Sequence, residues 1–274
     1  MIVFPNCKIN LGLNIIGKRT DGYHDLETVF FPLPLYDVLE IIQPAQVQND
    51  TTIKVTGIAL NGNDEDNLCM KAYRLLKKDF PQIPAIKTWL HKTIPAGAGL
   101  GGGSADGAHM LLLINRKFNL NLTQQKLLDY ALALGSDCPF FILNKPCFAE
   151  KRGEVLEPVP LNLSGYKLVL INPGIHVNTG WAFSHVKYSA AGQIKKAIQT
   201  PLQQWQNNLL NDFEPVVFKK YPEIQDIKTY LSEKGALYTS MSGTGSSVYG
   251  IFTGDNKIDI DIFPANYFIK EMIL

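Results

Sequence analysis

Long apolar runs and blocks of like charge are both missing from this chain. No apolar stretch reaches the length of about 18 residues that a membrane-spanning helix needs, and the start, MIVFPNCKIN, has no basic segment followed by an apolar one. The 26 Lys and Arg nearly balance the 25 Asp and Glu, which leaves a formal net charge of +1. The sequence therefore predicts no surface for nucleic acid or membrane. We expect a cytoplasmic protein that acts on a small-molecule substrate as a monomer or weak homodimer.

Cysteine is sparse, and its spacing suggests no pairing. Cys7, Cys69, Cys138 and Cys147 form no C-x-x-C motif, and no paired histidines accompany them. Neither a disulfide framework nor a zinc site is indicated. We expect reduced thiols that are packed inside the protein.

The composition is that of an ordinary globular protein, with 46% hydrophobic and 19% charged residues over 274 positions. This length suits one large domain or two medium ones. Residues 151–165 contain two Pro and two Gly, which favours a domain boundary there. We predict an N-terminal domain over residues 1–155 and a C-terminal domain over residues 156–274.

The stretch PAGAGLGGGSADGA, residues 95–108, holds six glycines. Glycine reaches positive φ and lets backbone amides converge on a ligand, at a cost in conformational entropy. A helix pattern follows, in which Ser104 is the expected N-cap, Asp106 is expected in the first turn, and Arg116 and Lys117 close the last turn. A glycine loop that opens a helix predicts a binding site for an anion such as phosphate.

Glycine-rich segments of this kind also occur in Walker A motifs, dinucleotide-binding loops, protein-kinase loops and plain linkers. Ser104 follows Gly103 with no Lys between them, which excludes Walker A. Gly97, Gly99 and Gly102 satisfy G-x-G-x-x-G, but no acidic residue ends a second strand about 20 residues later. The H-R-D and D-F-G motifs of protein kinases are absent, and linkers seldom precede strong helix signals.

Polar residues also occur in an alternating pattern near the N-terminus. Residues 3–15 predict a half-buried strand whose second face carries Asn6, Lys8, Asn10 and Asn14. That face is either exposed to solvent or functional, and the strand pattern alone does not decide between the two.

Two further polar features allow two interpretations each. Tyr23 and His24 follow a turn and are either ordinary packing or a binding edge. Asp137 precedes the apolar run 139–143, where it either caps a helix or has a chemical role.

The remaining periodicity predicts a mixture of helices and strands. Helices are expected at residues 67–80, 124–134 and 223–234, and Asn178 or Thr179 is expected to start a further helix over residues 181–188. Weaker helical signals lie in 193–211, a polar loop is expected at 61–66, and strands are expected at 37–42, 51–55, 87–94 and 166–172. Two strands flank the loop 242–247. The order of elements in the C-terminal half suggests a split-βαβ, ferredoxin-like domain.

Three motifs now stand in order along the chain, at residues 5–11, 95–108 and 242–247. Together they resemble the motifs of the galactokinase, homoserine kinase, mevalonate kinase and phosphomevalonate kinase superfamily. KINLGLNIIGKRTDGYH, PAGAGLGGGSADGA, GSDCPFF and MSGTGSSVYG are similar to one branch of it, which phosphorylates the 2-hydroxyl of a cytidine-linked methylerythritol in non-mevalonate isoprenoid biosynthesis. The resemblance implies an α+β, two-domain small-molecule kinase fold with a ribosomal-protein-S5-like N-terminal domain and a ferredoxin-like C-terminal domain.

The resemblance also implies a set of residue roles, with ATP as the phosphoryl donor and Mg²⁺ carried by the nucleotide on no assigned protein ligand. Asp137 would accept the hydroxyl proton, and Lys8 would keep Asp137 ionised and offset charge on the transferring phosphoryl group. The ATP phosphates would lie on Pro95, Ala96, Gly97, Ala98, Gly99, Leu100, Gly101, Gly102, Gly103 and Ser104. The substrate would contact Asn10, Tyr23, His24, Asp137, Phe183, Gly243, Thr244, Gly245 and Ser246, of which Tyr23, His24 and Phe183 would lie near the cytosine.

Two positions depart from the pattern of this branch. Gly107 stands where Ala is usual and Cys138 where Val is usual, and neither change removes a chemical role. The competing functions are another kinase of the superfamily, a nicotinamide-dependent oxidoreductase, and a non-catalytic module of the same fold. Neither of the last two would use Lys8 together with Asp137.

Overall fold

The computed structural model describes residues 1–44, 50–60 and 63–274. The chain packs into two compact units, each built from three segments. The first unit comprises Met1–Cys7, Leu35–Ala96 and Gly101–Lys145, and the second comprises Lys8–Pro34, Gly97–Leu100 and Pro146–Leu274. The domain division at residue 155 stays a prediction.

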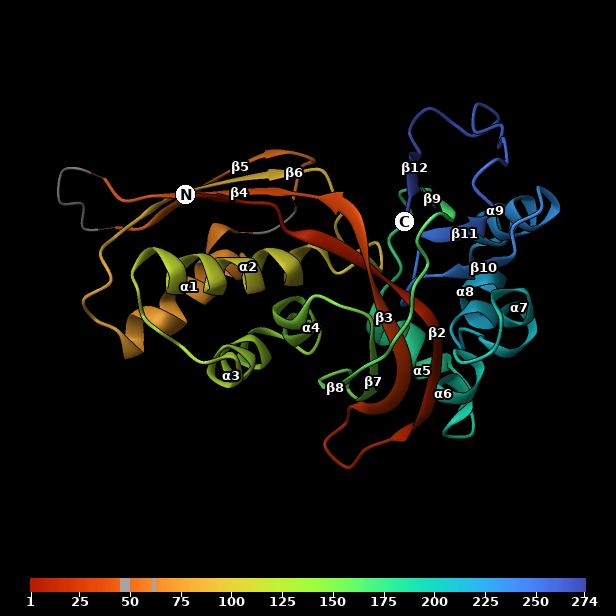
Figure 1. The fold of residues 1–274 in the computed structure, drawn as a ribbon, viewed down its shortest axis with the longest axis horizontal. Coiled ribbons are helices and arrows are strands. Elements are labelled where there is room, and N and C mark those ends of the chain that lie inside the picture. Colours follow the sequence, from red (N-terminus) through yellow and green to blue (C-terminus); the bar gives the residue numbers. More distant parts are fainter. Residues whose placement is uncertain (45–49, 61–62) are drawn as a thin grey trace. The chain divides into compact units, whose positions relative to one another are not determined.

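The first unit is a sheet with helices on one face (Figure 1). The strand order is β1-β4-β6-β5, with β4 antiparallel to both neighbours and β5 parallel to β6. The strands are β1 Ile2–Val3, β4 Val38–Ile42, β5 Thr52–Gly57 and β6 Lys87–Lys92. The helices are α1 Leu68–Asp79, α2 Gly102–Lys117, α3 Gln124–Leu134 and α4 Cys138–Leu143, with a short 3₁₀ turn, η1, at Asp64–Asp66.

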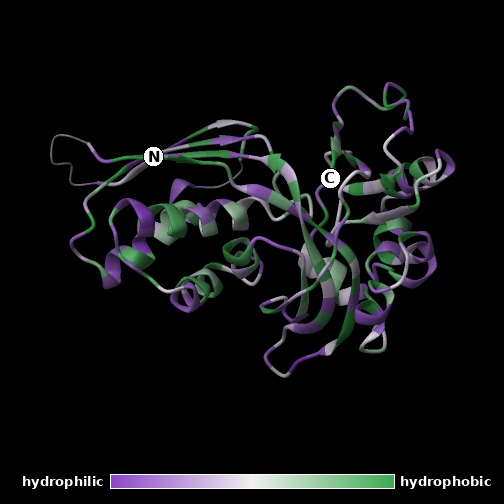
Figure 2. Ribbon diagram, in the orientation of Figure 1, coloured by the Kyte–Doolittle hydropathy of each residue, from purple (hydrophilic) through white to green (hydrophobic). Residues whose placement is uncertain are grey.

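The helices expected at residues 67–80 and 124–134 are confirmed as α1 and α3. The Asn67 side chain accepts a hydrogen bond from Cys69 N at the start of α1, and Thr123 accepts one from Lys126 N at the start of α3. Hydrophobic and hydrophilic residues both occur along the α1 and α2 ribbons (Figure 2). Residues 61 and 62 of the expected polar loop lie outside the described part of the chain.

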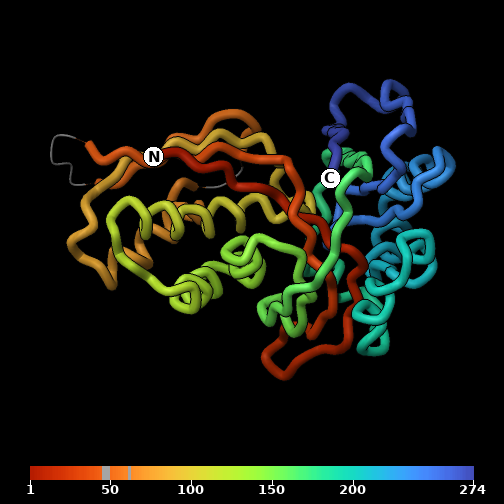
Figure 3. The backbone as a smooth tube through the Cα atoms, viewed as in Figure 1, coloured from red at the N-terminus to blue at the C-terminus, as the bar shows by residue number. Residues whose placement is uncertain are grey.

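The second unit contains two sheets. One has the order β2-β3-β7-β8 and the other the antiparallel order β10-β11-β9-β12. The first of these sheets brings residues 24–36 beside the chain that follows residue 146 (Figure 3). Its strands are β2 Asn6–Lys18, β3 His24–Tyr36, β7 Cys147–Lys151 and β8 Val155–Pro158; the second sheet contains β9 Lys167–Asn172, β10 Tyr238–Met241, β11 Val248–Phe252 and β12 Phe268–Ile273.

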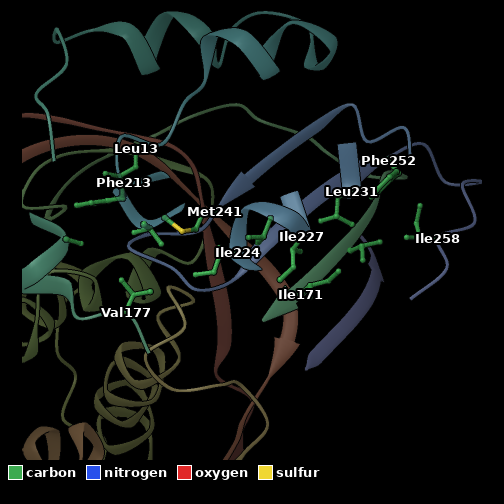
Figure 4. Packing of buried hydrophobic residues seen from close by; sticks show 14 of the residues in the cluster. Leu13, Ile171, Val177, Phe213, Ile224, Ile227, Leu231, Met241, Phe252 and Ile258 are labelled. Atoms are coloured by element: carbon green, nitrogen blue, oxygen red, sulfur yellow. The ribbon is translucent and has the colours of Figure 1, made fainter. Parts of the chain in front are cut away.

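The helices of the second unit are α5 Thr179–His185, α6 Gln193–Ala197, α7 Trp205–Asn208, α8 Glu214–Lys220 and α9 Pro222–Glu233, with a 3₁₀ turn, η2, at Leu202–Gln204. Helix α9 packs against β10 and β11, and α7 contacts β10. Ile224, Ile227 and Leu231 of α9 pack beside Met241 and Phe252 of the strands (Figure 4). Each buried side chain of this size contributes about 1.5 to 3 kcal/mol, so this cluster is a major source of the second unit's stability.

Two local expectations were wrong. Strand β2 is not half-buried, because Asn6, Lys8, Asn10 and Asn14 are all at most 5% exposed. The helix expected over residues 181–188 is α5, which ends at His185 because Val186 is extended. Its start is confirmed, since Asn178 is the N-cap and Thr179 the first helical residue.

The four cysteines are buried, as expected. Within residues 1–44, 50–60 and 63–274, no helix is long and apolar enough to cross a membrane.

Candidate active site

Strand β2 carries two buried polar side chains that meet in the second unit. Lys8 and Asn10 are 4% and 2% exposed. Lys8 Nζ donates to Asn10 Oδ1 at 2.6 Å and to Gly99 O at 3.2 Å, and it lies 4.9 Å from the ring centroid of Phe30. Asn10 Nδ2 in turn donates to Thr28 Oγ1 at 3.0 Å. A buried ammonium is costly unless it is hydrogen-bonded, and this strand face is built to hold one.

The glycine loop and the third motif also meet in the second unit. Ser242 Oγ donates to Gly99 O at 2.8 Å and accepts from Asn10 N at 3.2 Å, and Ser247 N donates to Ala98 O at 3.3 Å. Gly99 has φ +78°, and a Cβ there would lie 1.9 Å from Ser242 O. Only glycine permits this approach. The structure therefore brings parts of all three motifs together.

The third-motif loop is held by its own hydroxyl groups. Asn172 Nδ2 donates to Ser246 Oγ at 3.1 Å and to Ser247 Oγ at 3.0 Å. The Thr244 hydroxyl lies 3.3 Å from that of Thr179 at the start of α5. Gly243 and Gly245 both have positive φ in the loop, so its path depends on glycine at these two positions.

In the first unit, the glycine loop becomes a helix earlier than expected. Gly101 is the N-cap of α2, with φ +70°, and it makes no side-chain capping bond. Ser104 is therefore not the N-cap, and it lies inside the helix. Asp106 is not in the first turn either, because it lies further along α2 and is 2% exposed. Gly103 faces open space, since no described atom outside its own helix and its chain neighbours lies within 4 Å of a Cβ built there.

Asp137 is the N-cap residue of α4, but its side chain makes no capping hydrogen bond to the described residues. Capping therefore does not explain this half-buried carboxylate. The adjacent Cys138 thiol hydrogen-bonds with the Ser104 side chain, while burial raises the pKa of the thiol to about 12. The start of α2 and the Asp137 segment are thus neighbours within the first unit. Lys8 belongs to the second unit, so its partnership with Asp137 stays a prediction.

The structure brings together two of the three predicted base-binding residues. The His24 and Phe183 rings stack with centroids 4.8 Å apart and an interplanar angle of 23°. Burial, with a smaller effect of the Lys18 charge, lowers the pKa of His24 below its usual 6.5. Tyr23 is 54% exposed, and its ring lies 4.8 Å from the guanidinium carbon of Arg152, a neighbour that the sequence did not suggest.

Asn211 is a residue at this site that the sequence reasoning missed. Its Nδ2 donates to Met241 O at 2.7 Å and to Gly243 O at 2.9 Å, and its Oδ1 accepts from Phe213 N at 2.9 Å. Its backbone also bridges to Leu13 of β2. Asn211 therefore ties the third-motif loop to the strand that carries Lys8. Asn211 lies at the end of a Gln- and Asn-rich stretch, so its residue type did not distinguish it from its neighbours.

Asn211→Ala should lower the free energy of unfolding by about 1 to 3 kcal/mol, because the buried carbonyl of Met241 and the partly buried carbonyl of Gly243 lose their donor. Asn208→Ala is the matched control, since Asn208 Nδ2 makes one exposed bond to Gln204 O; it should change stability by less than about 0.5 kcal/mol. Denaturant unfolding of both variants measures the difference. Equal stabilities would show that the Asn211 amide does not hold the loop.

No group of three or more His, Cys, Asp or Glu side chains is placed to hold a metal ion in the parts of the chain that the structure describes.

Comparison with known proteins decides the family of this site. Residues 67–145 match the GHMP kinases N terminal domain, and residues 194–265 match the GHMP kinases C terminal domain. The chain belongs to the GHMP kinase family. The acronym covers galactokinase, homoserine kinase, mevalonate kinase and phosphomevalonate kinase, so the resemblance in the three motifs is confirmed, together with the two-domain α+β kinase fold. The protein is an ATP-dependent phosphotransferase.

The curated relatives narrow the family further. A Bacteroides fragilis protein named 4-diphosphocytidyl-2-C-methyl-D-erythritol kinase is 52% identical over 97% of this chain and 97% of its own length. A Porphyromonas gingivalis protein of the same name is 42% identical over 94% of each chain. This GHMP kinase thus groups with full-length relatives of one name.

Solved structures show the same fold. A crystal structure of 4-(cytidine 5′-diphospho)-2C-methyl-D-erythritol kinase superposes with a TM-score of 0.78 at 29% identity, covering 92% of this chain and 90% of that one. Mevalonate kinase from Methanococcus jannaschii superposes with a TM-score of 0.70 at 12% identity, covering 100% and 98% of the two chains. The second likeness shows the fold alone.

Proposed function

We propose that this kinase transfers the γ-phosphoryl group of ATP to the 2-hydroxyl of 4-diphosphocytidyl-2-C-methyl-D-erythritol, in non-mevalonate isoprenoid precursor biosynthesis. The observation that supports it most is the 52% identity over nearly the whole length to a relative of that name. The cluster of Lys8, Asn10, Gly99 and Ser242 in the second unit supports it as well, because it gathers a buried cation and parts of three kinase motifs.

In the proposed reaction, the oxygen of the substrate 2-hydroxyl forms a bond to the γ-phosphorus of ATP, and Asp137 accepts the proton of that hydroxyl. The bond from that phosphorus to the β–γ bridging oxygen breaks, and ADP leaves. Lys8 offsets charge on the transferring group, and the amides of the glycine loop and the N-terminus of α2 hold the phosphates. We expect Mg²⁺ to arrive with ATP and to keep several waters.

The proposed base-recognition residues are His24, Phe183 and Tyr23. A neutral imidazole offers one donor and one acceptor, which suits the mixed donor and acceptor edge of cytosine. The lowered pKa of His24 keeps the ring neutral above pH 6.5. Aromatic stacking adds about 1 to 3 kcal/mol per base, and we assign this stacking to Phe183.

The KM for the cytidine substrate should therefore stay constant above pH 6.5 and rise only on acidification, with a midpoint below that value. The sign follows from the lowered pKa, because protonation below it removes the imidazole acceptor. A pH series of KM tests this expectation. His24→Gln, which keeps a donor and an acceptor but does not titrate, separates the contribution of His24 from titration of the substrate phosphates. A wild-type profile that His24→Gln leaves unchanged would contradict the role of His24.

A panel of acceptors tests the substrate itself. ADP release should depend on the cytidine-linked substrate and stay at background with mevalonate or homoserine. Turnover of one of those acceptors, with none on the cytidine compound, would assign a different kinase activity of the same family.

A further inference from the structure

Three charged side chains that the proposed reaction does not use are buried together in the first unit. Lys92, Asp37 and Asp106 are 2%, 0% and 2% exposed. Lys92 Nζ donates to Asp106 Oδ2 at 2.6 Å and also to Asp37 Oδ2. One ammonium thus bridges two carboxylates.

The members of this triad contact both ends of the glycine loop. Lys92 ends β6, and the chain continues through Thr93 and Ile94 into the loop. Asp37 Oδ1 accepts hydrogen bonds from Thr93 N at 2.6 Å and Ile94 N at 2.9 Å, which fixes the entrance. Asp106 lies on α2, the helix that leaves the loop. Lys92 therefore joins the entrance of the loop to its exit.

The spacing between the two ends is tight. A Cβ added to Gly102, the first residue of α2, would lie 2.9 Å from Ile94 Cγ2 and 3.5 Å from Lys92 Nζ. The ammonium thus lies beside the first residue of the helix, where Gly102 allows the close approach. A change in the triad would therefore shift the backbone at the ends of the loop.

Stability alone does not account for this cluster. A buried ion triad is often no more stable than well-packed apolar residues in its place. Here Asp106 Oδ1 has no hydrogen-bond partner among the described residues, and burial raises the pKa of Asp106 to about 7, with Asp37 raising it further and Lys92 opposing the shift. The unpaired oxygen and the raised pKa both indicate that burying Asp106 costs free energy.

We propose that Asp37, Lys92 and Asp106 are positioning residues that hold the two ends of the glycine loop at the spacing required to receive the ATP phosphates. The proposal rests on the proposed role of that loop in ATP binding. The triad acts through the loop backbone and sets the affinity for ATP. It does not affect the affinity for the acceptor or the rate of the chemical step.

Asp106→Ala tests the proposal with the full-length protein. The variant removes the tether to α2 but leaves Lys92 paired with Asp37, so no buried ion is left alone and the protein should fold. A misplacement of about 1 Å can cost about 100-fold, and the Kd for ATP alone and the KM for ATP should both rise by about 10-fold to 100-fold. The kcat at saturating ATP and the KM for the acceptor should stay within about twofold.

Asp106→Asn is the rescue variant, because its amide oxygen still accepts from Lys92, and it should bind ATP within about threefold of wild type. Asp129→Ala removes an exposed carboxylate on α3 and should leave the Kd and the KM for ATP unchanged. If Asp106→Ala does not fold, Asp106→Ser replaces it, since its shorter side chain cannot reach Lys92.

Two outcomes would overturn the proposal. One is a folded Asp106→Ala or Asp106→Ser variant that binds ATP like wild type, and the other is a parallel loss of kcat and of affinity for both substrates. Wild-type protein that binds no ATP would instead refute the proposed function of the loop.

Discussion

Asp137→Asn should lower kcat by about 10² to 10⁴, the contribution of a positioned general base. The amide keeps the shape of the side chain but cannot accept the hydroxyl proton. Asn has nearly the size of Asp and is as common at a helix N-cap, so the free energy of unfolding should change by less than about 0.5 kcal/mol. Steady-state kinetics at saturating substrates, with a thermal unfolding curve, measure both quantities.

A true capping residue provides the matched control for this variant. The Thr123 hydroxyl accepts a hydrogen bond from Lys126 N at 3.3 Å, so Thr123→Ala should cost about 0.5 to 2 kcal/mol of stability and leave kcat unchanged. The two variants should thus show opposite patterns. A folded Asp137→Asn with wild-type kcat would refute the general-base role, even though membership of the kinase family would stand.

Lys8 should be coupled to Asp137 in the same assay. Lys8→Met removes the ammonium that Asn10 Oδ1 and Gly99 O accept from, and kcat should fall severely. In the double variant the loss should be much smaller than the product of the single losses, because removing either member already disables the unit. Independent, multiplicative losses would show that the two residues do not act together.

Gly103→Val should lower kcat/KM for ATP by about 100-fold, since a displacement of about 1 Å in a positioned group costs that much. Gly103 is the sharpest position for this test. Its Cβ would point into open space, with no described atom within 4 Å beyond its own helix and its chain neighbours, so the fold should tolerate the valine. The valine side chain would, however, displace a phosphate bound at the start of α2.

Neighbouring glycines are less informative targets. Gly101 has φ +70°, so a valine there is strained even without ligand, and a Cβ on Gly99 would collide with Ser242 O. Gly17→Val is the matched control, because it also faces open space, and it should leave ATP kinetics unchanged. Wild-type ATP affinity in a folded Gly103→Val would show that the phosphates lie elsewhere.

Local periodicity in the sequence predicted the helices and most strands. The caps Asn67 and Thr123 and the C-terminal Gly135 adjoin the helices that they bound, and signals of this kind act within a few residues. The predicted start of α2 was wrong because residue type alone does not show which of several neighbouring residues begins a helix. Ser104 has the residue type of an N-cap, but the left-handed conformation of Gly101 already begins the helix.

Features that depend on long-range contacts could not be predicted. The alternation in β2 is compatible with one wet face, and only the partners Thr28, Gly99 and Ser242, far away in the sequence, show that the face is buried. Asn211 and Arg152 carry no motif and acquire their contacts through tertiary packing. Their roles are visible only in the structure.

The most direct test of the proposed function is ADP release from ATP with and without 4-diphosphocytidyl-2-C-methyl-D-erythritol, followed by ³¹P NMR of the product. The account predicts ADP release that requires this acceptor, one new phosphomonoester on its 2-hydroxyl per ADP, and loss of both signals in Asp137→Asn. Acceptor-independent ADP release, or phosphorylation at another position, would contradict it.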